Sequence, residues 1–365
     1  MEQALTDVFF TTSQTTDTLL RTPRPDILFI IMESCGAAFT WLAGNDEVTP
    51  NLTRLARQSI SFNQCYCNSW RTDRALVSIL SGWPAFPNLS VMKMPAKTTA
   101  LPGLAASLKS EGYYSTFLYG GDANFTNTRG YLVDTGFDSI VSQDDFSVAQ
   151  RVDSKWGVCD SIAFDRLSLL LSHPKAKRNF TVMLTLSSHE PWTVPMTPHF
   201  SDPVLNAFYY LDLHLGRFIE RFKQTPQWEN TLVIILPDHG INYKNLEETN
   251  PLRAHIPMIW TGGAVSHPAV INTFCSQSDL AATLLGQMDI PHSEYPWSRD
   301  VLSVDYRRPF AQHNWPDGFS IMDSTGYHVF DLNAHRVIKG ADGSAIQTGK
   351  AILQATSRHL KNLIK

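Results

Sequence analysis

The sequence has no long apolar run, no block of basic residues and no signal-peptide pattern. No stretch approaches the roughly 18 consecutive apolar residues of a membrane-spanning helix, and the longest apolar run near the start is residues 27–32. Met1 is not followed by a basic region and an apolar core, as a signal peptide requires. The 30 basic and 34 acidic residues give a net charge of −4. Without clustered Lys and Arg, we expect no nucleic acid as partner.

Cysteines are also few. Five cysteines in 365 residues do not make a disulfide framework, and the odd number leaves at least one unpaired within the chain. Cys65 and Cys67 are too close in sequence to bridge each other easily, and no C-x-x-C pair of the metal-binding type occurs. We therefore expect none of the five cysteines to do chemistry.

The composition predicts a folded chain with a sizeable core. Hydrophobic residues make up 43% and charged residues 18%, which excludes a disordered or low-complexity protein. Residues 1–24 have a linker-like composition, rich in hydroxyl side chains. No strong linker divides residues 25–300, which we interpret as one domain. Residues 301–365 are expected to form a β-rich C-terminal extension that ends in a helix.

Short β-type runs alternate with helical segments along residues 25–300. This alternation predicts an α/β fold, a three-layer α/β/α sandwich with a mostly parallel central sheet. The expected strands are residues 26–33, 113–119, 180–186, 231–236 and 256–261, and the expected helices are residues 49–57, 75–80, 101–111, 206–222 and 279–285. Beyond residue 300, short strands are expected at residues 310–312, 320–322 and 328–331.

Polar side chains of metal-ligand type stand at several strand ends. Glu33 ends the first strand, and Asp238 and His239 follow the strand at residues 231–236. His189 follows the strand at residues 180–186, and His255 precedes the last one. Each alone reads equally well as a turn or a helix cap. Because the active sites of open α/β sheets lie beyond the carboxyl ends of the strands, their coincidence predicts a site there.

The loop before the helix at residues 75–80 supplies a candidate nucleophile. Thr72 or Ser69 could simply cap that helix. Alternatively, the Thr72 hydroxyl lies at a helix N-terminus that attracts an anion such as phosphate, and a metal activates it for attack. Glu33, Thr72, Asp238 and His239 would then form a tetrahedral site with three oxygen donors and one nitrogen.

In their order and spacing these motifs resemble the lipoteichoic-acid-synthase-like group of the alkaline phosphatase/sulfatase superfamily. The members of that group are cell-envelope phosphoglycerol transferases and related bacterial proteins. The resemblance covers roughly residues 25–300. It rests on IIMES at residues 30–34, VTPNL at 48–52, RTDR at 71–74, YGGD at 119–122, WG at 156–157, LSSHEP at 186–191, PDHG at 237–240, HIP at 255–257 and SDLAATLL at 278–285.

The resemblance implies roles for individual residues. The expected metal ligands are Glu33, Thr72, Asp238 and His239, with Thr72 also the nucleophile. The other expected site residues are His189 and His255 as substrate-site histidines, Trp156 lining the head-group pocket, Arg71 and Arg74 flanking the nucleophile, and Asp122, Asn124 and Arg129 bordering the pocket. Either histidine could donate the proton to the leaving oxygen, since histidine titrates near neutral pH. Arg71 and Arg74 either pair with a phosphate or are ordinary solvated arginines.

Two departures from the superfamily limit the chemistry. Formylglycine sulfatases mature a Cys or Ser in a C/S-x-P-x-R motif, which neither residues 35–39 nor residues 65–69 fit. Two-metal phosphatases need a second set of Asp and His ligands, which the sequence does not show. We therefore expect one divalent metal, Mn²⁺ or Zn²⁺, with Mg²⁺ also possible for this mixed ligand set.

The expected activity is transfer of a phosphoglycerol-type group from a phospholipid donor to an envelope glycan or another alcohol, through a phosphothreonine. The alternatives are a phosphodiesterase, phosphatase or sulfuric-ester hydrolase of the same superfamily, and a binding module without chemistry. The family usually carries membrane helices. We therefore expect an extracytoplasmic soluble domain, periplasmic or otherwise in the cell envelope, of an inner-membrane protein that is anchored by a segment missing from this sequence.

Overall fold

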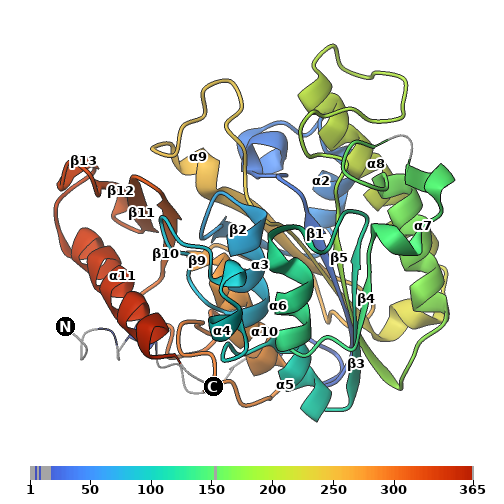
Figure 1. The fold of residues 1–365 in the computed structure, drawn as a ribbon, viewed down its shortest axis with the longest axis horizontal. Helices are drawn as coiled ribbons and strands as arrows, with labels where there is room; N and C mark the ends of the chain where they lie inside the picture. Colours follow the sequence, from blue (N-terminus) through green and yellow to red (C-terminus); the bar gives the residue numbers. More distant parts are fainter. Residues whose placement is uncertain (1–4, 6–7, 10–17, 152–153, 364–365) are drawn as a thin grey trace.

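A large mixed sheet forms the centre of the molecule (Figure 1). The computed structural model describes Leu5, Val8, Phe9 and residues 18–151 and 154–363. Within these residues nine strands lie in the order β4-β3-β5-β1-β6-β7-β2-β8, with β9 beside β2. Their bounds are β1 Asp26–Met32, β2 Ile60–Tyr66, β3 Tyr113–Tyr119, β4 Ser139–Val141, β5 Arg178–Leu184, β6 Thr231–Pro237, β7 His255–Thr261, β8 Ala269–Ile271 and β9 Cys275–Ser276. Only β7 runs antiparallel to its neighbours in this described sheet, which confirms the mostly parallel arrangement.

The central strand β1 is apolar throughout because both of its faces are buried. Successive side chains of a strand point to opposite faces of the sheet. Alternate residues therefore enter two separate cores, one containing Ile27, Phe29 and Ile31 and the other Leu28, Ile30 and Met32.

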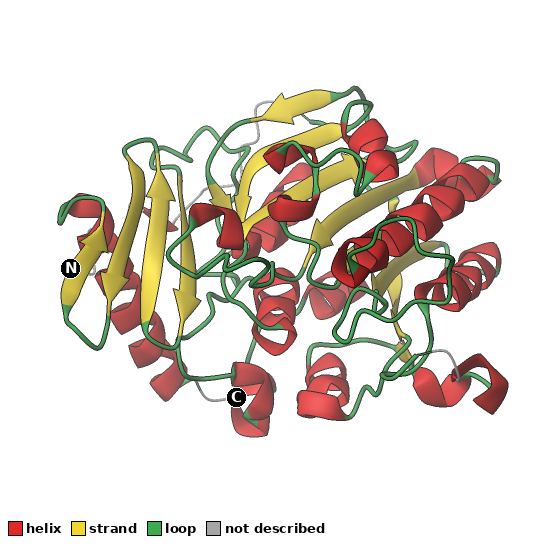
Figure 2. Cartoon of the chain, turned by 90° about the horizontal axis from the view of Figure 1, so that it is seen from above, coloured by secondary structure: helices red, strands yellow, loops and turns green. Residues whose placement is uncertain are grey.

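Helices cover both faces of this sheet, which confirms the three-layer α/β/α sandwich (Figure 2). One layer contains α2 (Pro50–Ala56), α7 (Asp160–Ser172) and α8 (Pro203–Phe222). The other contains α3 (Thr72–Ser81), α5 (Leu104–Ser110), α6 (Thr128–Asp134) and α10 (Leu280–Gln287). Two single turns, α4 (Pro95–Thr98) and α9 (Pro251–Ala254), complete this region. In the described part of the chain, no helix is both long and apolar enough to cross a membrane.

A separate antiparallel sheet forms the C-terminal part, at the left of Figure 1. Its strands are β10 (Phe310–Trp315), β11 (Gly318–Asp323), β12 (Gly326–Asp331) and β13 (Arg336–Lys339). The helix α11 (Ser344–Asn362) packs on β11 and β12. Gly349 permits this close approach, because a Cβ there would lie 2.3 Å from the Phe319 ring. The short strands expected beyond residue 300 all lie within β10–β12.

Most of the linker-like segment at residues 1–24 lies outside the described residues. Those described include Leu5, Val8, Phe9, Leu19 and Leu20, which are buried in a core of the molecule. The Phe9 ring meets the rings of Trp297 and Phe310 edge-on, at 5.2 and 6.3 Å. The division of the chain at residues 24 and 300 stays a prediction.

The sequence patterns miss five of the described strands, β2, β4, β8, β9 and β13, and the helices α4, α6, α7 and α9, and they misplace some helix ends. β2 was not expected, because Ser61, Asn63 and Gln64 interrupt its apolar pattern. The helix expected at residues 75–80 begins earlier, at Thr72, and ends at Ser81, where the C-cap Gly82 has a φ of 59° that suits a glycine. The helix expected at residues 101–111 begins only at Leu104, after a Pro-Gly pair.

Candidate metal centre

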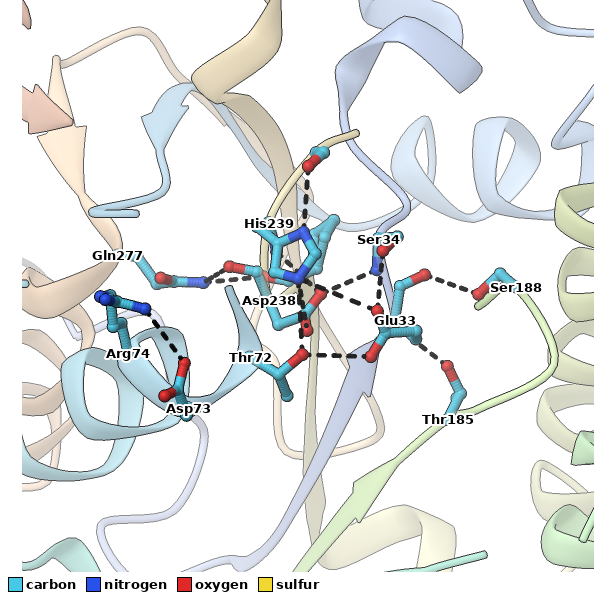
Figure 3. A network of polar contacts seen from close by, with 12 residues as sticks. Glu33, Ser34, Thr72, Asp73, Arg74, Thr185, Ser188, Asp238, His239 and Gln277 are labelled. Atoms are coloured by element: carbon cyan, nitrogen blue, oxygen red, sulfur yellow. Dashed lines mark hydrogen bonds and ion pairs between the residues drawn. The ribbon is translucent and has the colours of Figure 1, made fainter. Parts of the chain in front are cut away.

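Two parallel strands and one helix bring four predicted ligands together (Figure 3). β1 and β6 pair in register, with Met32 opposite Pro237. Glu33 and Asp238 therefore leave the sheet side by side. Thr72, the first residue of α3, faces them from the layer of helices.

The distances between the four side chains fit one cation. The Thr72 Oγ1 lies 3.4 Å from Glu33 Oε2 and 3.4 Å from His239 Nε2. His239 Nε2 lies 3.4 Å from Asp238 Oδ2 and 3.8 Å from Glu33 Oε1. Tetrahedral sites with bonds of about 2.0–2.2 Å place neighbouring ligand atoms about 3.4 Å apart. The predicted ligand set is thus arranged as such a site requires.

Asp238 offers an oxygen that accepts no hydrogen bond from the described residues. Its Oδ1 accepts the backbone N–H groups of Ser34 and His239, both at 2.8 Å. Its Oδ2 is buried and has no such donor. A buried carboxylate oxygen without a donor is costly unless another positive partner is present. A metal ion at this position would supply that partner.

His239 is oriented with one ring nitrogen toward the cluster. Its Nδ1 lies 3.0 Å from the Gly240 carbonyl oxygen, which requires the proton to be on Nδ1. Burial lowers the pKa of His239, against the opposing effect of Asp238, so the ring is neutral near pH 7. The Nε2 lone pair is then available to a metal, and the backbone hydrogen bond fixes the ring, as is usual for metal-binding histidines.

Glu33 sits among backbone and hydroxyl partners that hold it in place. Burial, and then the neighbouring Asp238, raise the pKa of Glu33 well above its usual range. The Ser34 hydroxyl donates to Glu33 Oε1 at 2.7 Å. The backbone of Glu33 is held by Thr185 Oγ1 at 2.9 Å and by the Ser188 hydroxyl at 2.6 Å. A divalent cation would offset the repulsion between two buried carboxylates.

The residues that support the ligands were not predicted. Ser34 and Ser188 lie inside the motifs around Glu33 and His189, so their positions were a usable signal. For Thr185 and Gln277 the sequence gave no such signal. Gln277 donates its Nε2 to the carbonyl oxygens of Pro237 and Asp238, both at 2.8 Å, and so fixes the end of β6.

The Thr72 hydroxyl does not cap α3. The N-cap residue is Arg71, and no side chain makes the cap hydrogen bond. The Ser69 hydroxyl donates to the Asn314 carbonyl oxygen at 3.3 Å instead. The capping interpretation is therefore wrong for both residues, and the Thr72 hydroxyl instead contacts Glu33 and His239.

His189 and Trp156 lie together beside a groove of about 460 Å³. Their rings are 5.1 Å apart, and the exposed Phe125 ring lies 6.5 Å from Trp156. The Glu190 carbonyl oxygen accepts the Trp156 indole N–H at 2.6 Å and lies 2.9 Å from His189 Nδ1. The groove is lined by Ser154, Lys155, Trp156, Leu186, Ser187, His189, Pro191, Thr193, Val194 and Pro195.

The two arginines beside Thr72 differ in their surroundings. Arg74 is largely buried and pairs with Asp73 at 3.4 Å, while Lys93 approaches the same carboxylate at 3.5 Å. Arg71 is exposed, lies 4.5 Å over the Trp70 ring and forms no ion pair with any described residue. Arg71 is therefore the better placed of the two to meet an anion.

Asp122, Asn124 and Arg129 bond mainly to one another. Asp122 Oδ1 accepts the Asn124 backbone N–H at 2.8 Å, and Asn124 Oδ1 accepts Arg129 Nε–H at 3.2 Å. Arg129 also donates to the Ser142 hydroxyl at 3.0 Å. These hydrogen bonds do not reach the four ligands, so the roles of the three residues stay predictions.

His255 is turned toward β2. Its Nε2 lies 2.8 Å from the Asn63 carbonyl oxygen, and its ring stacks on Tyr66 with centroids 4.8 Å apart. The described contacts of the ring do not include any of the four ligands. A role for His255 in proton transfer stays a prediction, which these contacts do not support.

The chain resembles known proteins along most of its length. Residues 25–290 match the sulfatase family. The chain is 24% identical over 321 residues to the lipoteichoic acid synthase-like YvgJ of Bacillus subtilis, covering 78% of this chain and 51% of that protein. It is 24% identical over 308 residues to phosphoglycerol transferase I of Xanthomonas campestris, covering 77% and 43%. The chain thus spans about half the length of these relatives, or less.

Two solved structures share the fold. A protein of the alkaline phosphatase superfamily from Vibrio parahaemolyticus superposes with a TM-score of 0.84 at 24% identity, covering 100% of this chain and 98% of that one. The lipoteichoic acid synthase LtaP from Listeria monocytogenes gives a TM-score of 0.81 at 15% identity, covering 99% and 98%. The predicted resemblance is confirmed, and with residues 25–290 matched the chain belongs to the sulfatase family.

Proposed function

We propose that the chain is the catalytic domain of a metal-dependent transferase that moves a phosphoglycerol-type head group from a lipid donor to an envelope acceptor. The observation that supports this most is the Thr72 hydroxyl, 3.4 Å from both Glu33 and His239 at the start of α3. A hydroxyl among three metal-ligand side chains is placed to act as a nucleophile. Mn²⁺ or Zn²⁺ suits the site best, with Mg²⁺ a further candidate.

The reaction would pass through a phosphothreonine. When bound, the metal lowers the pKa of the Thr72 hydroxyl and polarises a phosphoryl oxygen. Thr72 Oγ1 would lose its proton to solvent and form a bond to phosphorus as the bond to the donor's alcohol oxygen breaks, while protonated His189 would donate the proton that the alcohol, diacylglycerol, carries away. An acceptor alcohol would then give its proton to the neutral His189 and attack phosphorus, and the Thr72 oxygen would leave and regain a proton from solvent.

The start of α3 would stabilise the phosphoryl charge. The first amides of a helix have no partner within it, and the helix dipole favours an anion there. The exposed Arg71 adjoins these amides. The groove beside Trp156 and His189 has room for a glycerol head group.

A hydrolase of the same superfamily would share the first half-reaction and differ only in using water as the acceptor. Cleavage of sulfate esters is less well supported. The position of the nucleophile holds Thr72, and all five cysteines, from Cys35 to Cys275, are buried and free. A formylglycine cannot form from threonine by the route used in sulfatases.

The names of the relatives favour an envelope location. The proteins from Bacillus subtilis and Xanthomonas campestris are named as a lipoteichoic acid synthase-like protein and a phosphoglycerol transferase. The proposed donor is a phospholipid and the proposed acceptor an envelope glycan or another alcohol. We propose an extracytoplasmic domain that meets its lipid through a membrane segment outside this sequence.

The test is mass spectrometry of the Thr72 peptide after incubation with Mn²⁺ and a panel of head-group-labelled phospholipids. We expect a phosphoglycerol ester on Thr72 with a phosphatidylglycerol-type donor, and its loss when an alcohol acceptor is added. The Thr72→Ala protein serves as the blank. Label released to water at an equal rate with and without acceptor would make the protein a hydrolase, and an unlabelled Thr72 peptide with every donor would overturn the proposal.

A further inference from the structure

The C-terminal sheet touches the loop that carries Thr72. Its first strand, β10, follows residues 67–69 closely, although the match to the sulfatase family ends at residue 290. The Asn314 N–H donates to the Asn68 carbonyl oxygen at 2.9 Å, and Asn68 Nδ2 donates to the Gln312 carbonyl oxygen at 3.3 Å. The segment before the nucleophile is therefore paired with a strand more than 240 residues away in sequence.

His313 lies at the centre of this contact. It is fully buried, with Nδ1 2.9 Å from the Cys67 carbonyl oxygen and Nε2 2.8 Å from Glu248 Oε2. Both of these oxygens are acceptors, so the ring must carry a proton on each nitrogen to satisfy both. Burial opposes the charged ring, but the Cys67 side chain, whose Sγ lies 3.6 Å from Nδ1, and the Glu248 carboxylate outweigh it and raise the pKa of His313 to about 10.

Glu248 continues the connection toward His239. Its carboxylate pairs with Arg253 at 2.9 Å, and the Tyr327 hydroxyl of β12 holds its backbone carbonyl at 2.9 Å. Arg253 Nη1 donates to the Gly240 carbonyl oxygen. That same carbonyl oxygen accepts the Nδ1–H of His239.

One largely buried chain of polar contacts thus joins the loop before the proposed nucleophile to the candidate metal-ligand histidine. It runs from the Cys67 carbonyl through His313, Glu248 and Arg253 to the Gly240 carbonyl. Its two ends lie in the two loops that present Thr72 and His239 to the cluster. Charge-assisted hydrogen bonds in a low-dielectric interior are strong and directional, so such a chain restrains both ends together.

We propose that His313, Glu248 and Arg253 are positioning residues that hold Thr72 and His239 at their mutual distance, which makes the C-terminal sheet part of the active site. The effect on turnover rests on the function proposed above, whereas the restraint on the two loops does not. A metal-binding or catalytic centre loses affinity or rate, commonly by about 10–100-fold, when the residues that orient its ligands are changed.

The alternative is that the charged side chains of His313, Glu248 and Arg253 only stabilise the fold. The same sheet offers a matched control in His328 of β12, which is also buried and lies 2.9 Å from Thr325 Oγ1. The described polar contacts of the His328 ring all lie within the C-terminal part of the chain, with Asp323, Thr325 and Ala341. They do not reach the loops that carry Thr72 and His239. A purely structural role predicts similar effects for His313→Gln and His328→Gln.

The experiment compares the parent with His313→Gln, Glu248→Gln and His328→Gln by three measurements. The first is hydrogen–deuterium exchange of peptides covering residues 67–72 and 238–241. The second is calorimetric titration of the metal-free protein with Mn²⁺. The third is kcat and KM on the donor that labels Thr72. Glu248 lies partly exposed at 21%, so Glu248→Gln keeps the test valid if His313→Gln does not fold.

We expect faster exchange in both loops, Mn²⁺ affinity weaker by about tenfold or more, and kcat at least tenfold lower with KM within about threefold, for His313→Gln and Glu248→Gln. His328→Gln should stay within about twofold of the parent in all three. Exchange and Mn²⁺ affinity that match the His328→Gln protein would overturn the proposal. If both change as expected while no donor labels Thr72 in the parent, the restraint is supported and the function proposed above is the part that fails.

Discussion

Replacing Thr72 by Ala separates chemistry from stability more sharply than any other change in this chain. The hydroxyl makes only long contacts, at 3.4 Å, to Glu33 and His239, and it caps no helix. Losing one such contact costs about 0.5–1 kcal/mol, and Ala at a helical position returns part of it. The free energy of unfolding should therefore change by less than about 1 kcal/mol, or about 1–2 °C in Tm for a chain of 365 residues.

The effect on turnover should be far larger. If Thr72 is the nucleophile, removing Oγ1 should lower kcat at least about a thousandfold, which is about 4 kcal/mol of activation free energy. Thr72→Ser keeps a hydroxyl at the same place and should retain measurable activity. The assay measures release of the labelled head group by the three proteins under identical Mn²⁺ and lipid concentrations, and Tm is measured by calorimetry on the same proteins without metal, so that lost metal binding does not enter the stability comparison.

Ser78, on the same helix, provides the matched control. Its buried hydroxyl donates to the Trp83 carbonyl oxygen at 2.9 Å, so Ser78→Ala should cost about 1 kcal/mol of stability. That variant should keep kcat within about twofold although its stability falls at least as far as that of Thr72→Ala. Near-parent turnover in Thr72→Ala, or equal losses in both variants, would refute the assignment of Thr72 as nucleophile.

Three further predictions concern the metal, the cysteines and the loss of folding stability at acid pH. His239→Ala removes the nitrogen ligand and should weaken Mn²⁺ binding by at least about tenfold in calorimetry, while the circular dichroism spectrum stays that of the parent. Cys65→Ala and Cys159→Ala delete buried thiols that we expect to do no chemistry, so kcat should stay within a few-fold of the parent value. A total loss of activity would instead favour formylglycine-type or thiol chemistry. Burial, and then Arg217, lower the pKa of His214 to about 4. Because the unfolded chain binds that proton near pH 6.5, the free energy of unfolding should fall as the pH is lowered from 6.5 toward 4. In urea titrations at pH 7 and pH 5, His214→Gln should lose about 1 kcal/mol less stability between the two pH values than the parent does. Equal losses in the two proteins would contradict the assignment.

The four candidate metal ligands could be picked out in the sequence because each stands at a locally recognisable boundary. The apolar runs at β1 and β6 predict buried parallel strands, and Glu33 and Asp238 follow directly where these runs stop. In a parallel sheet both ends necessarily lie at the same edge. The sequence therefore places Glu33 and Asp238 at the same edge of the sheet, whereas the pairing of β1 with β6 that brings them side by side is decided by the strand order.

Where strands are not uniformly apolar, the sequence was a poorer guide. β2 carries polar residues within its run and was missed, although it lies beside the reversed strand β7. The sequence correctly placed His255 at a strand boundary, but it did not indicate the direction in which the side chain points. Its ring follows the pleat toward Asn63 and Tyr66 of β2, and that neighbour is known only once the strand order is known.

The sequence alone thus determined the α/β class and singled out the candidate ligands Glu33, Asp238 and His239 and the candidate nucleophile Thr72, because local apolar periodicity and chain order are sufficient to locate the ends of elements. Only the tertiary structure decided which residues hold these groups in place. His313 meets the Cys67 carbonyl across 246 positions of sequence, and no local pattern encodes a contact of that separation. Such contacts depend on how whole layers pack, since the burial and pairing of a charged side chain are properties of the assembled core rather than of its neighbours in the chain.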